Sequence, residues 1–125
     1  MRGSREDLPV TIEADEAVVR EAEWGDIHVG FETYNEDFDL APLLKGLPDD
    51  VCQCPHYGYV LEGRMRVKYA DREEDVEAGE AYYIAPGHAP IMEAGTEIVE
   101  FSPKDEYHKT MEVAERNFAA TQADH

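Results

Sequence analysis

The strongest constraint on the fold is a series of short strand-like runs that end at glycine turns. Residues 56–62 stop at Gly63, and residues 81–85 lie between Gly79 and Gly87. Roughly seven or eight such runs follow one another, and no helical pattern interrupts them until the last fifth of the chain. Short strands at this spacing are typical of a β-sandwich or barrel, so we expect an all-β fold.

The run that begins at Ile27 alternates between apolar and polar residues. The alternation predicts a strand that places Ile27, Val29 and Phe31 in the core. His28 then lies on the opposite, polar face with Glu32, and we interpret it as an exposed strand histidine. If that face lines the barrel instead, His28 is a third histidine of the site.

The end of the chain has a different pattern. Ser102 is interpreted as a helix N-cap and Pro103 as the first helical residue. Apolar residues then recur at helical spacing, namely Tyr107, Met111, Ala114 and Phe118. We expect a helix from about Pro103 to Ala119 within a C-terminal helix and tail at 104–125. Its apolar stripe needs a partner, either the barrel of its own chain or a second subunit.

Two further segments complete a single-domain organisation. Residues 1–15 are polar and rich in acids, which predicts a flexible N-terminal arm with a short strand near 10–12. Residues 35–50 are irregular but apolar enough to pack as a flap over one end of the fold. The strands between them place the barrel at 16–103, and a chain of 125 residues is one domain by size.

Charge and cysteine content limit the partners and the compartment. The net charge of −18 argues against nucleic acid and against anionic membranes, because both would be repelled. No apolar run approaches the roughly 18 residues of a membrane helix, and residues 1–7 lack an apolar signal core. Cys52 and Cys54 are too close in sequence for an unstrained disulfide. We therefore expect a cytoplasmic protein in a reducing compartment.

The paired glycine-ended runs resemble the two motifs of the cupin superfamily. The first cupin motif has two histidines, then a glutamate, then a glycine seven residues after the glutamate. Gly63 matches that glycine, so His56 stands where many cupins carry the glutamate. Cys52 is the nearest match to the second histidine, and the two histidines themselves are absent.

The second motif is matched by Gly79 and by the turn at Pro86 and Gly87. Pro90 occupies the usual place of the third histidine, and His88 lies two residues earlier. The chain also looks like a branch of small single-domain bacterial cupins without an assigned activity. The resemblance implies a jelly-roll barrel, also called a double-stranded β-helix, that carries a C-terminal α-helix and forms a homodimer.

The resemblance also implies that His56 points into the barrel, where His88 would approach it from a neighbouring strand. Two imidazoles there could bind a divalent metal ion such as Zn, Fe, Cu, Ni or Mn. Cys52 or Cys54 could add a thiolate, which suits tetrahedral zinc. The alternative is a metal-free pocket in which both histidines form hydrogen bonds to buried tyrosines and carboxylates.

Glu100 and Tyr59 are the candidate catalytic residues. Glu100 alternates with Val99 and Phe101, so on an inward face it would be buried and could serve as a general base or a third ligand. The alternative for Glu100 is a solvated surface acid. Tyr59 belongs to a set of tyrosines around the two motifs, of which some would line a pocket and others would pack in the core or at a subunit interface.

These observations lead to one functional hypothesis with two alternatives. The chain is expected to be a small cupin that binds a divalent metal, a small organic ligand or both inside the barrel through His56 and His88. The first alternative is a metal-dependent enzyme, of oxygenase or isomerase type, acting on a small organic substrate. The second is a cupin that binds its ligand without a metal.

Overall fold

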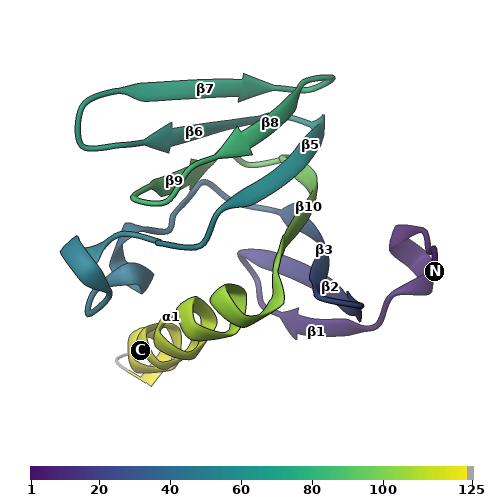
Figure 1. The fold of residues 1–125 in the computed structure, drawn as a ribbon, viewed down its shortest axis with the longest axis horizontal. Helices are drawn as coiled ribbons and strands as arrows, with labels where there is room; N and C mark the ends of the chain where they lie inside the picture. The colour runs from purple at the N-terminus through teal and green to yellow at the C-terminus, as the bar shows by residue number, and fades with distance from the viewer. Residues whose placement is uncertain (124–125) are drawn as a thin grey trace.

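The computed structural model describes residues 1–123 and contains two antiparallel β-sheets beside one long helix (Figure 1). The larger sheet has the order β1-β2-β3-β10-β5-β8, which are Val10–Glu13, Ala17–Trp24, Ile27–Tyr34, Glu97–Pro103, His56–Glu62 and Ala81–Ile84. The smaller sheet has the order β4-β9-β6-β7, which are Phe38–Asp39, Ala89–Met92, Arg64–Lys68 and Glu73–Glu77. The all-β expectation is confirmed, although the described residues form ten strands and not seven or eight.

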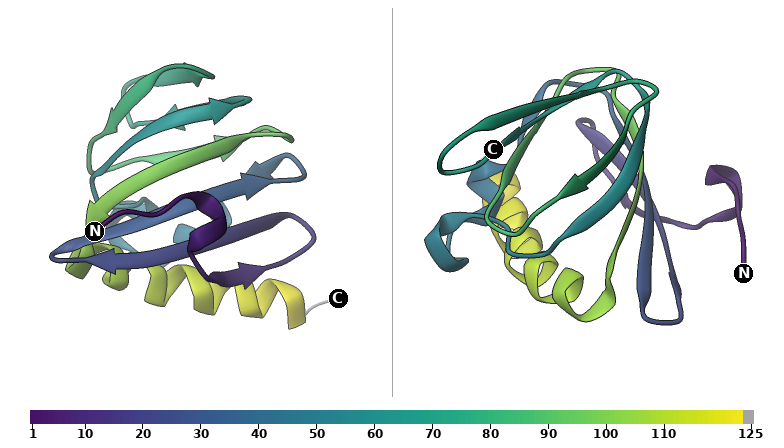
Figure 2. Two further views of the ribbon diagram at one scale, coloured as in Figure 1. Left: turned by 90° about the vertical axis from the view of Figure 1, so that its right-hand side faces the viewer. Right: turned by 45° about the horizontal axis from the view of Figure 1, so that its top comes forward.

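The two sheets curve around a common interior (Figure 2). The core between them is built from inward residues of both sheets, namely Val60, Met65, Val67, Ile84, Met92 and Ile98. The turn at Gly63 connects β5 to β6 and passes close to the backbone of Thr96. Gly63 has a φ of 80°, and a Cβ there would lie 2.6 Å from the Cα of Thr96. Only glycine fits this turn, which explains why the strand run ends there.

The helix α1 (Lys104–Ala123) lies beside the barrel and packs mainly against the short 3₁₀ helix η2 (Ala41–Leu44). Its predicted apolar stripe is confirmed, because Tyr107, Met111, Ala114 and Phe118 all line the interior of their own chain. The stripe therefore supplies no argument for a second subunit. Two more 3₁₀ turns occur, η1 (Arg5–Asp7) and η3 (Pro48–Asp50).

The predicted start of the helix is wrong. Ser102 and Pro103 belong to β10, and α1 begins at Lys104. The Ser102 hydroxyl lies 2.7 Å from Nδ1 of His56, so it serves the interior and not the helix terminus. The sequence pattern of a cap was present, but a buried polar partner competes for the same hydroxyl.

The expected orientation of β3 is also wrong for its polar residues. His28 is only 4% exposed, whereas Ile27 is 39% exposed. The face with His28 and Glu32 points inward because the interior there is polar and is covered by α1. Alternation identified which residues share a face, but it did not identify which face is buried.

The N-terminal segment and the flap both pack against the rest of the fold. Within residues 1–15, β1 pairs with β2 and Leu8 is buried. Leu40, Leu43 and Leu44 of the 35–50 segment line the interior, as expected of a flap. The division into an arm at 1–15, a barrel at 16–103 and a helix with tail at 104–125 stays a prediction, and residues 124–125 of that tail lie outside the described part.

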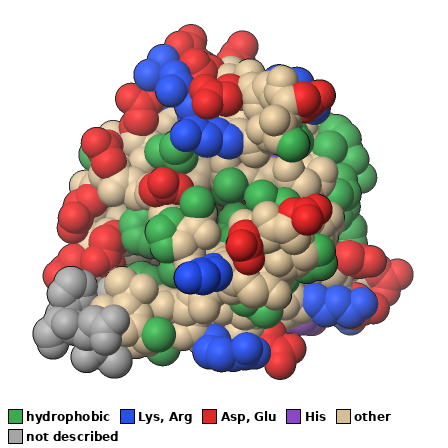
Figure 3. Space-filling view, turned by 90° about the vertical axis from the view of Figure 1, so that its left-hand side faces the viewer, with side chains coloured by type: hydrophobic (Ala, Val, Ile, Leu, Met, Phe, Trp, Pro, Cys, Tyr) green, Lys and Arg blue, Asp and Glu red, His purple; other side chains and the backbone are tan. Residues whose placement is uncertain are grey.

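The surface reflects the net charge of −18. On the face drawn in Figure 3, acidic side chains lie along much of the edge and also among the hydrophobic side chains toward the middle. Within residues 1–123, the helices are too short or too polar to cross a lipid bilayer.

Candidate functional site

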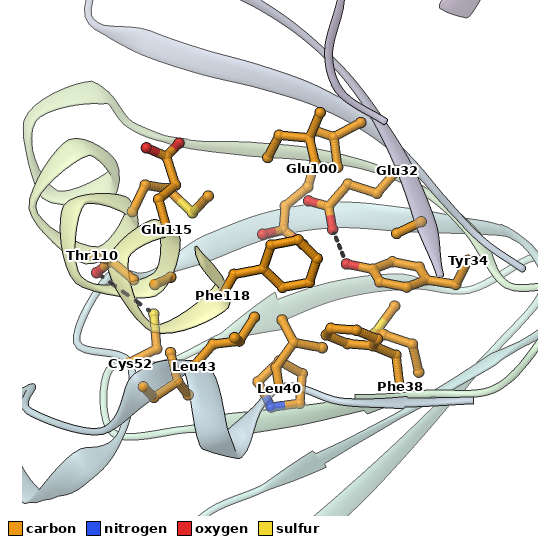
Figure 4. A pocket seen from close by; sticks show the side chains of 18 of the residues that line it. Glu32, Tyr34, Phe38, Leu40, Leu43, Cys52, Glu100, Thr110, Glu115 and Phe118 are labelled. Atoms are coloured by element: carbon orange, nitrogen blue, oxygen red, sulfur yellow. Dashed lines mark hydrogen bonds between the residues drawn. The ribbon is translucent and has the colours of Figure 1, made fainter. Parts of the chain in front are cut away.

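A cavity of about 440 Å³ lies between the two sheets, the η2 segment and α1 (Figure 4). Its walls are mostly apolar, but polar side chains enter it from several strands. Cys52, His56 and His88 lie together in the lining. Figure 4 shows Cys52 at one part of the wall and Glu32 and Tyr34 at another. A mostly apolar cavity with a few polar groups is the usual form of a small-molecule site.

Cys52, His56 and His88 converge in this cavity, and we call them the Cys-His-His trio. His56 is the first residue of β5, whereas Cys52 and His88 are paired by a bridge between loop segments, in which the Cys52 N–H donates to the His88 carbonyl at 2.8 Å. One donor atom from each side chain lies within 4.8 Å of the other two, and all three residues are buried. The structure thus brings together His56, His88 and one of the two cysteines.

Both histidines have Nδ1 engaged, so Nε2 is the ring nitrogen that each can offer to a ligand. The His88 Nδ1–H donates to the carbonyl of Ala85 at 2.7 Å. His56 Nδ1 lies 2.7 Å from the Ser102 hydroxyl and also 2.7 Å from a carboxylate oxygen of Glu100. Metal-binding histidines commonly donate their second ring nitrogen to a carbonyl or carboxylate in this way, because that bond fixes the ring and its tautomer. The trio therefore fits a divalent metal ion, with two imidazole nitrogens and one sulfur as its donors.

Electrostatics within the trio favour a thiolate. Burial alone would raise the pKa of Cys52, but hydrogen bonding to His56 and His88 outweighs it and lowers the pKa to about 6. Burial alone would lower the pKa of His56, but the charge of Glu100 and the hydrogen bond to Cys52 raise it to about 10. Cys52 Sγ and His56 Nε2 lie 3.6 Å apart. A thiolate is the form of cysteine that binds metals.

Glu100 is buried at 9% exposure, so the alternative of a solvated surface acid is wrong. Tyr82 donates to its second oxygen at 2.6 Å. Burial would raise the pKa of Glu100, but His56 and the Tyr82 hydroxyl together lower it. Tyr82 reaches Glu100 by crossing over Gly58, where a Cβ would lie 2.5 Å from the Tyr82 hydroxyl. Glycine at 58 therefore makes room for the hydrogen bond.

Glu32 is a cavity residue that the sequence did not single out. The Tyr34 hydroxyl donates to it at 2.5 Å, and both side chains point into the cavity (Figure 4). Burial and the charge of Glu100 raise the pKa of Glu32 to about 8. The signal was present, because Glu32 shares a face with His28 and Gly30, but that face was assigned to solvent.

Two predicted site residues lie elsewhere. Cys54 is buried, yet its thiol is directed to the Pro55 carbonyl at 3.4 Å and is not part of the trio. Burial first, and then the neighbouring Cys52, raise the pKa of Cys54 to about 12, which disfavours a thiolate. Tyr59 is 41% exposed on the outer face of β5, since its neighbours Gly58 and Val60 take the inward positions. Tyr82 is the tyrosine that contacts Glu100.

A second histidine–carboxylate pair lies where α1 meets the larger sheet. His28 Nε2 and a Glu21 oxygen are 2.5 Å apart, and the Tyr107 hydroxyl donates to Glu21 at 2.7 Å. The rings of His28 and Tyr107 stack with centroids 3.5 Å apart. Thr11 also donates to Glu21. Burial opposes ionisation, but these three partners lower the pKa of Glu21 to about 2.

Comparison with solved structures identifies the fold. A cupin described as RmlC-like, from Shewanella frigidimarina, aligns with a TM-score of 0.55 at 15% identity, over 81% of this chain and 88% of that one. KdgF from a Halomonas species aligns with a TM-score of 0.54 at 15% identity, over 82% and 94%. The chain has the cupin fold. The sequence resemblance to cupins is thereby confirmed at the level of fold.

Other comparisons add little about chemistry. The iron(II) form of HppE aligns with a TM-score of 0.56 at 15% identity, over 82% of this chain and 59% of that one. No family profile matches the sequence, and no curated protein matches it. At this identity the similarity concerns the fold, so the chemistry has to be argued from the cavity itself.

Proposed function

We propose that this chain is a small cupin that binds one divalent metal ion through the Cys-His-His trio and a small organic ligand in the adjoining cavity. The observation that carries the proposal is the convergence of three donors, among which both histidines have their other ring nitrogen, Nδ1, already engaged. Because the trio lines the same cavity, a bound ion would face the ligand. We infer zinc first, since it takes nitrogen and sulfur donors readily, with Cu, Ni or Fe next.

The residues around the trio have separate tasks in this proposal. Glu100 holds the proton of His56 at Nδ1 and so directs Nε2 at the ion. Tyr82 holds Glu100 in place, and the apolar walls exclude water from the ligand. When bound, a divalent ion supplies Lewis-acid chemistry, which is the basis for the alternative of a metal-dependent enzyme.

One observation favours the metal-free alternative. Cys52 Sγ lies 3.6 Å from His56 Nε2, and their contact lowers the pKa of Cys52 and raises that of His56. The trio therefore has internal contacts that need no metal ion. In that case the same cavity binds an organic ligand alone.

Elemental analysis of the untagged protein, purified without added metal, separates these possibilities. We expect one metal ion per chain in the wild type and in the exposed-histidine control His108→Ala, and less than a tenth of that, roughly the loss expected on removing one ligand, in His56→Ala and His88→Ala. Circular dichroism of each variant checks that it folds. A wild-type protein that contains no metal and cannot be loaded with Zn, Fe, Cu, Ni or Mn contradicts metal binding.

Two expectations on assembly and compartment stay predictions. A homodimer is supported by exposed apolar side chains on the outer face of β5, β8 and β10, namely Tyr57, Tyr59, Leu61, Tyr83 and Phe101. A cytoplasmic location is supported by the two free cysteines, which suit a reducing compartment.

A further inference from the structure

The part of the cavity away from the Cys-His-His trio combines a carboxyl group with three aromatic rings. The rings of Tyr34 and Phe38 have centroids 6.1 Å apart, and those of Phe38 and Phe118 are 6.5 Å apart. All three line the cavity, and we call them the aromatic wall. Glu32 lies beside this wall and receives the Tyr34 hydroxyl (Figure 4).

Apart from its histidines, the charged side chains that line the cavity are all carboxylates. Four glutamates line it, namely Glu16, Glu32, Glu100 and Glu115, and the lining contains no lysine or arginine within the described residues. In the part of the cavity away from the trio, a carboxylate or phosphate ligand would meet these carboxyl groups with no lysine or arginine to pair with. The net charge of −18 adds a field that attracts cations to the protein.

Three inward carboxyl groups belong to strands of the larger sheet, and Glu32 differs from the other two in its hydrogen-bond partners. Glu100 has His56 and Tyr82, and Glu21 has His28, Thr11 and Tyr107. Within residues 1–123, Glu32 receives only the Tyr34 hydroxyl, and that bond uses one of its two oxygens. It is thus the inward carboxyl group that has no cationic partner.

We propose that the cavity binds an organic cation, whose ammonium group lies between the Glu32 carboxylate and the aromatic wall. Aromatic faces attract ammonium groups through their quadrupoles, and a nearby carboxylate adds direct charge pairing. The apolar remainder of the cavity then encloses the hydrocarbon part of the molecule. This inference rests on the proposed function, because it names the ligand class of the same cavity.

The proposal predicts a particular dependence on pH. Binding of a cation requires an ionised Glu32, and the pKa of Glu32 is raised to about 8 by burial and by Glu100. Affinity should therefore increase as the pH rises from about 6 to about 9 and then level off. Four ionisable groups act directly on Glu32, namely Glu21, Tyr34, His56 and Glu100, and the cavity is also lined by Glu16, Cys52, His88, Tyr107 and Glu115. Comparison with Glu32→Gln removes their shared contribution.

The test is an NMR titration of the full-length protein with choline and with its neutral isostere, in which a tert-butyl group replaces the trimethylammonium group. Choline has no lone pair on nitrogen, so that group cannot coordinate a metal. We expect choline to bind the wild type at least about 10-fold more tightly than the isostere. Glu32→Gln should lose this preference and its pH dependence, and Phe118→Leu should weaken choline binding a few-fold.

Glu112→Gln is the matched control, since Glu112 is an exposed carboxylate of α1 that does not line the cavity. It should keep the preference for choline, and Glu32→Gln should still bind the neutral isostere if it is folded. Equal binding of choline and the isostere to the wild type would overturn the inference, as would a preference that survives Glu32→Gln. Metal content measured on the same samples keeps failure of the metal proposal distinguishable from failure of this one.

Discussion

Two buried histidine–carboxylate pairs in this protein look alike but are connected differently. His56 uses Nδ1 to contact Glu100, so its Nε2 faces Cys52. His28 uses Nε2 to contact Glu21, and its ring is covered by Tyr107 of α1. The role of each histidine depends on which ring nitrogen contacts the carboxylate and on which side chain lies next to the ring. In the proposed function, the His56 pair orients a donor atom toward a metal ion, whereas the His28 pair connects α1 to the larger sheet.

The two cysteines give the largest expected effect in this comparison. Cys52→Ser removes a donor of the trio, so zinc affinity should fall at least about 100-fold, given that roughly 10–16 kcal/mol is shared among the ligands of a structural zinc site. Cys54→Ser removes a buried thiol outside the trio and should leave affinity within about 3-fold. Competition with a chelator measures both. Equal losses in the two variants would contradict the assignment of Cys52.

Substitution of the two glutamates tests whether the two histidine–carboxylate pairs act independently. Glu100→Gln weakens the hold on the His56 ring, so zinc affinity should fall about 10- to 100-fold, as is typical for the outer partner of a metal-binding histidine. Glu21→Gln acts on the His28 pair and should leave zinc affinity unchanged while it lowers the melting temperature. If Glu21→Gln weakens zinc binding as much as Glu100→Gln, the two pairs are not separate.

The smallest effect concerns acid unfolding. The pKa of Glu21 is opposed by burial but lowered overall, from 4.5 to about 2, by His28, Thr11 and Tyr107. A depressed carboxyl pKa stabilises the fold above the unfolded value, and this contribution is lost as the pH falls from about 5 to about 2. Allowing for solvent screening, it is worth about 1–2 kcal/mol.

Urea unfolding of the wild type and Glu21→Gln across this range measures the effect. The stability difference between them should be full near neutral pH and shrink on acidification. A difference that stays constant down to about pH 2 would contradict the role of the ionised Glu21.

The glycine turns were enough to predict an all-β fold, because Gly63 and Gly79 adopt positive φ at the ends of strands, whereas the cupin fold was predicted from the resemblance of the two motifs. The resemblance to the cupin motifs correctly predicted that His56 points inward, and strand parity places Tyr57 on the opposite, exposed face. Parity failed on β3, where both faces carry buried residues. A polar inward face looks like a solvated one in sequence, so Glu32 and His28 were misplaced.

The remaining contacts depend on neighbours that are distant in the chain. Nothing local distinguishes Tyr82 from Tyr59 as the partner of Glu100, since the choice depends on the register of β5 against β8 and on the space above Gly58. Ser102 was assigned to a helix cap because its partner His56 lies 46 positions away. Such contacts are set by strand pairing, which a single sequence does not reveal.

The position of α1 has a consequence for how this protein can change over generations. The helix supplies Phe118 and much of the cavity wall from one terminal segment, whereas the trio is held by strands and loops of the barrel. Substitutions along the helix stripe can reshape the space offered to a guest molecule without breaking a single strand ladder. A lineage could therefore diversify its choice of small molecule while the inner chemistry is inherited unchanged.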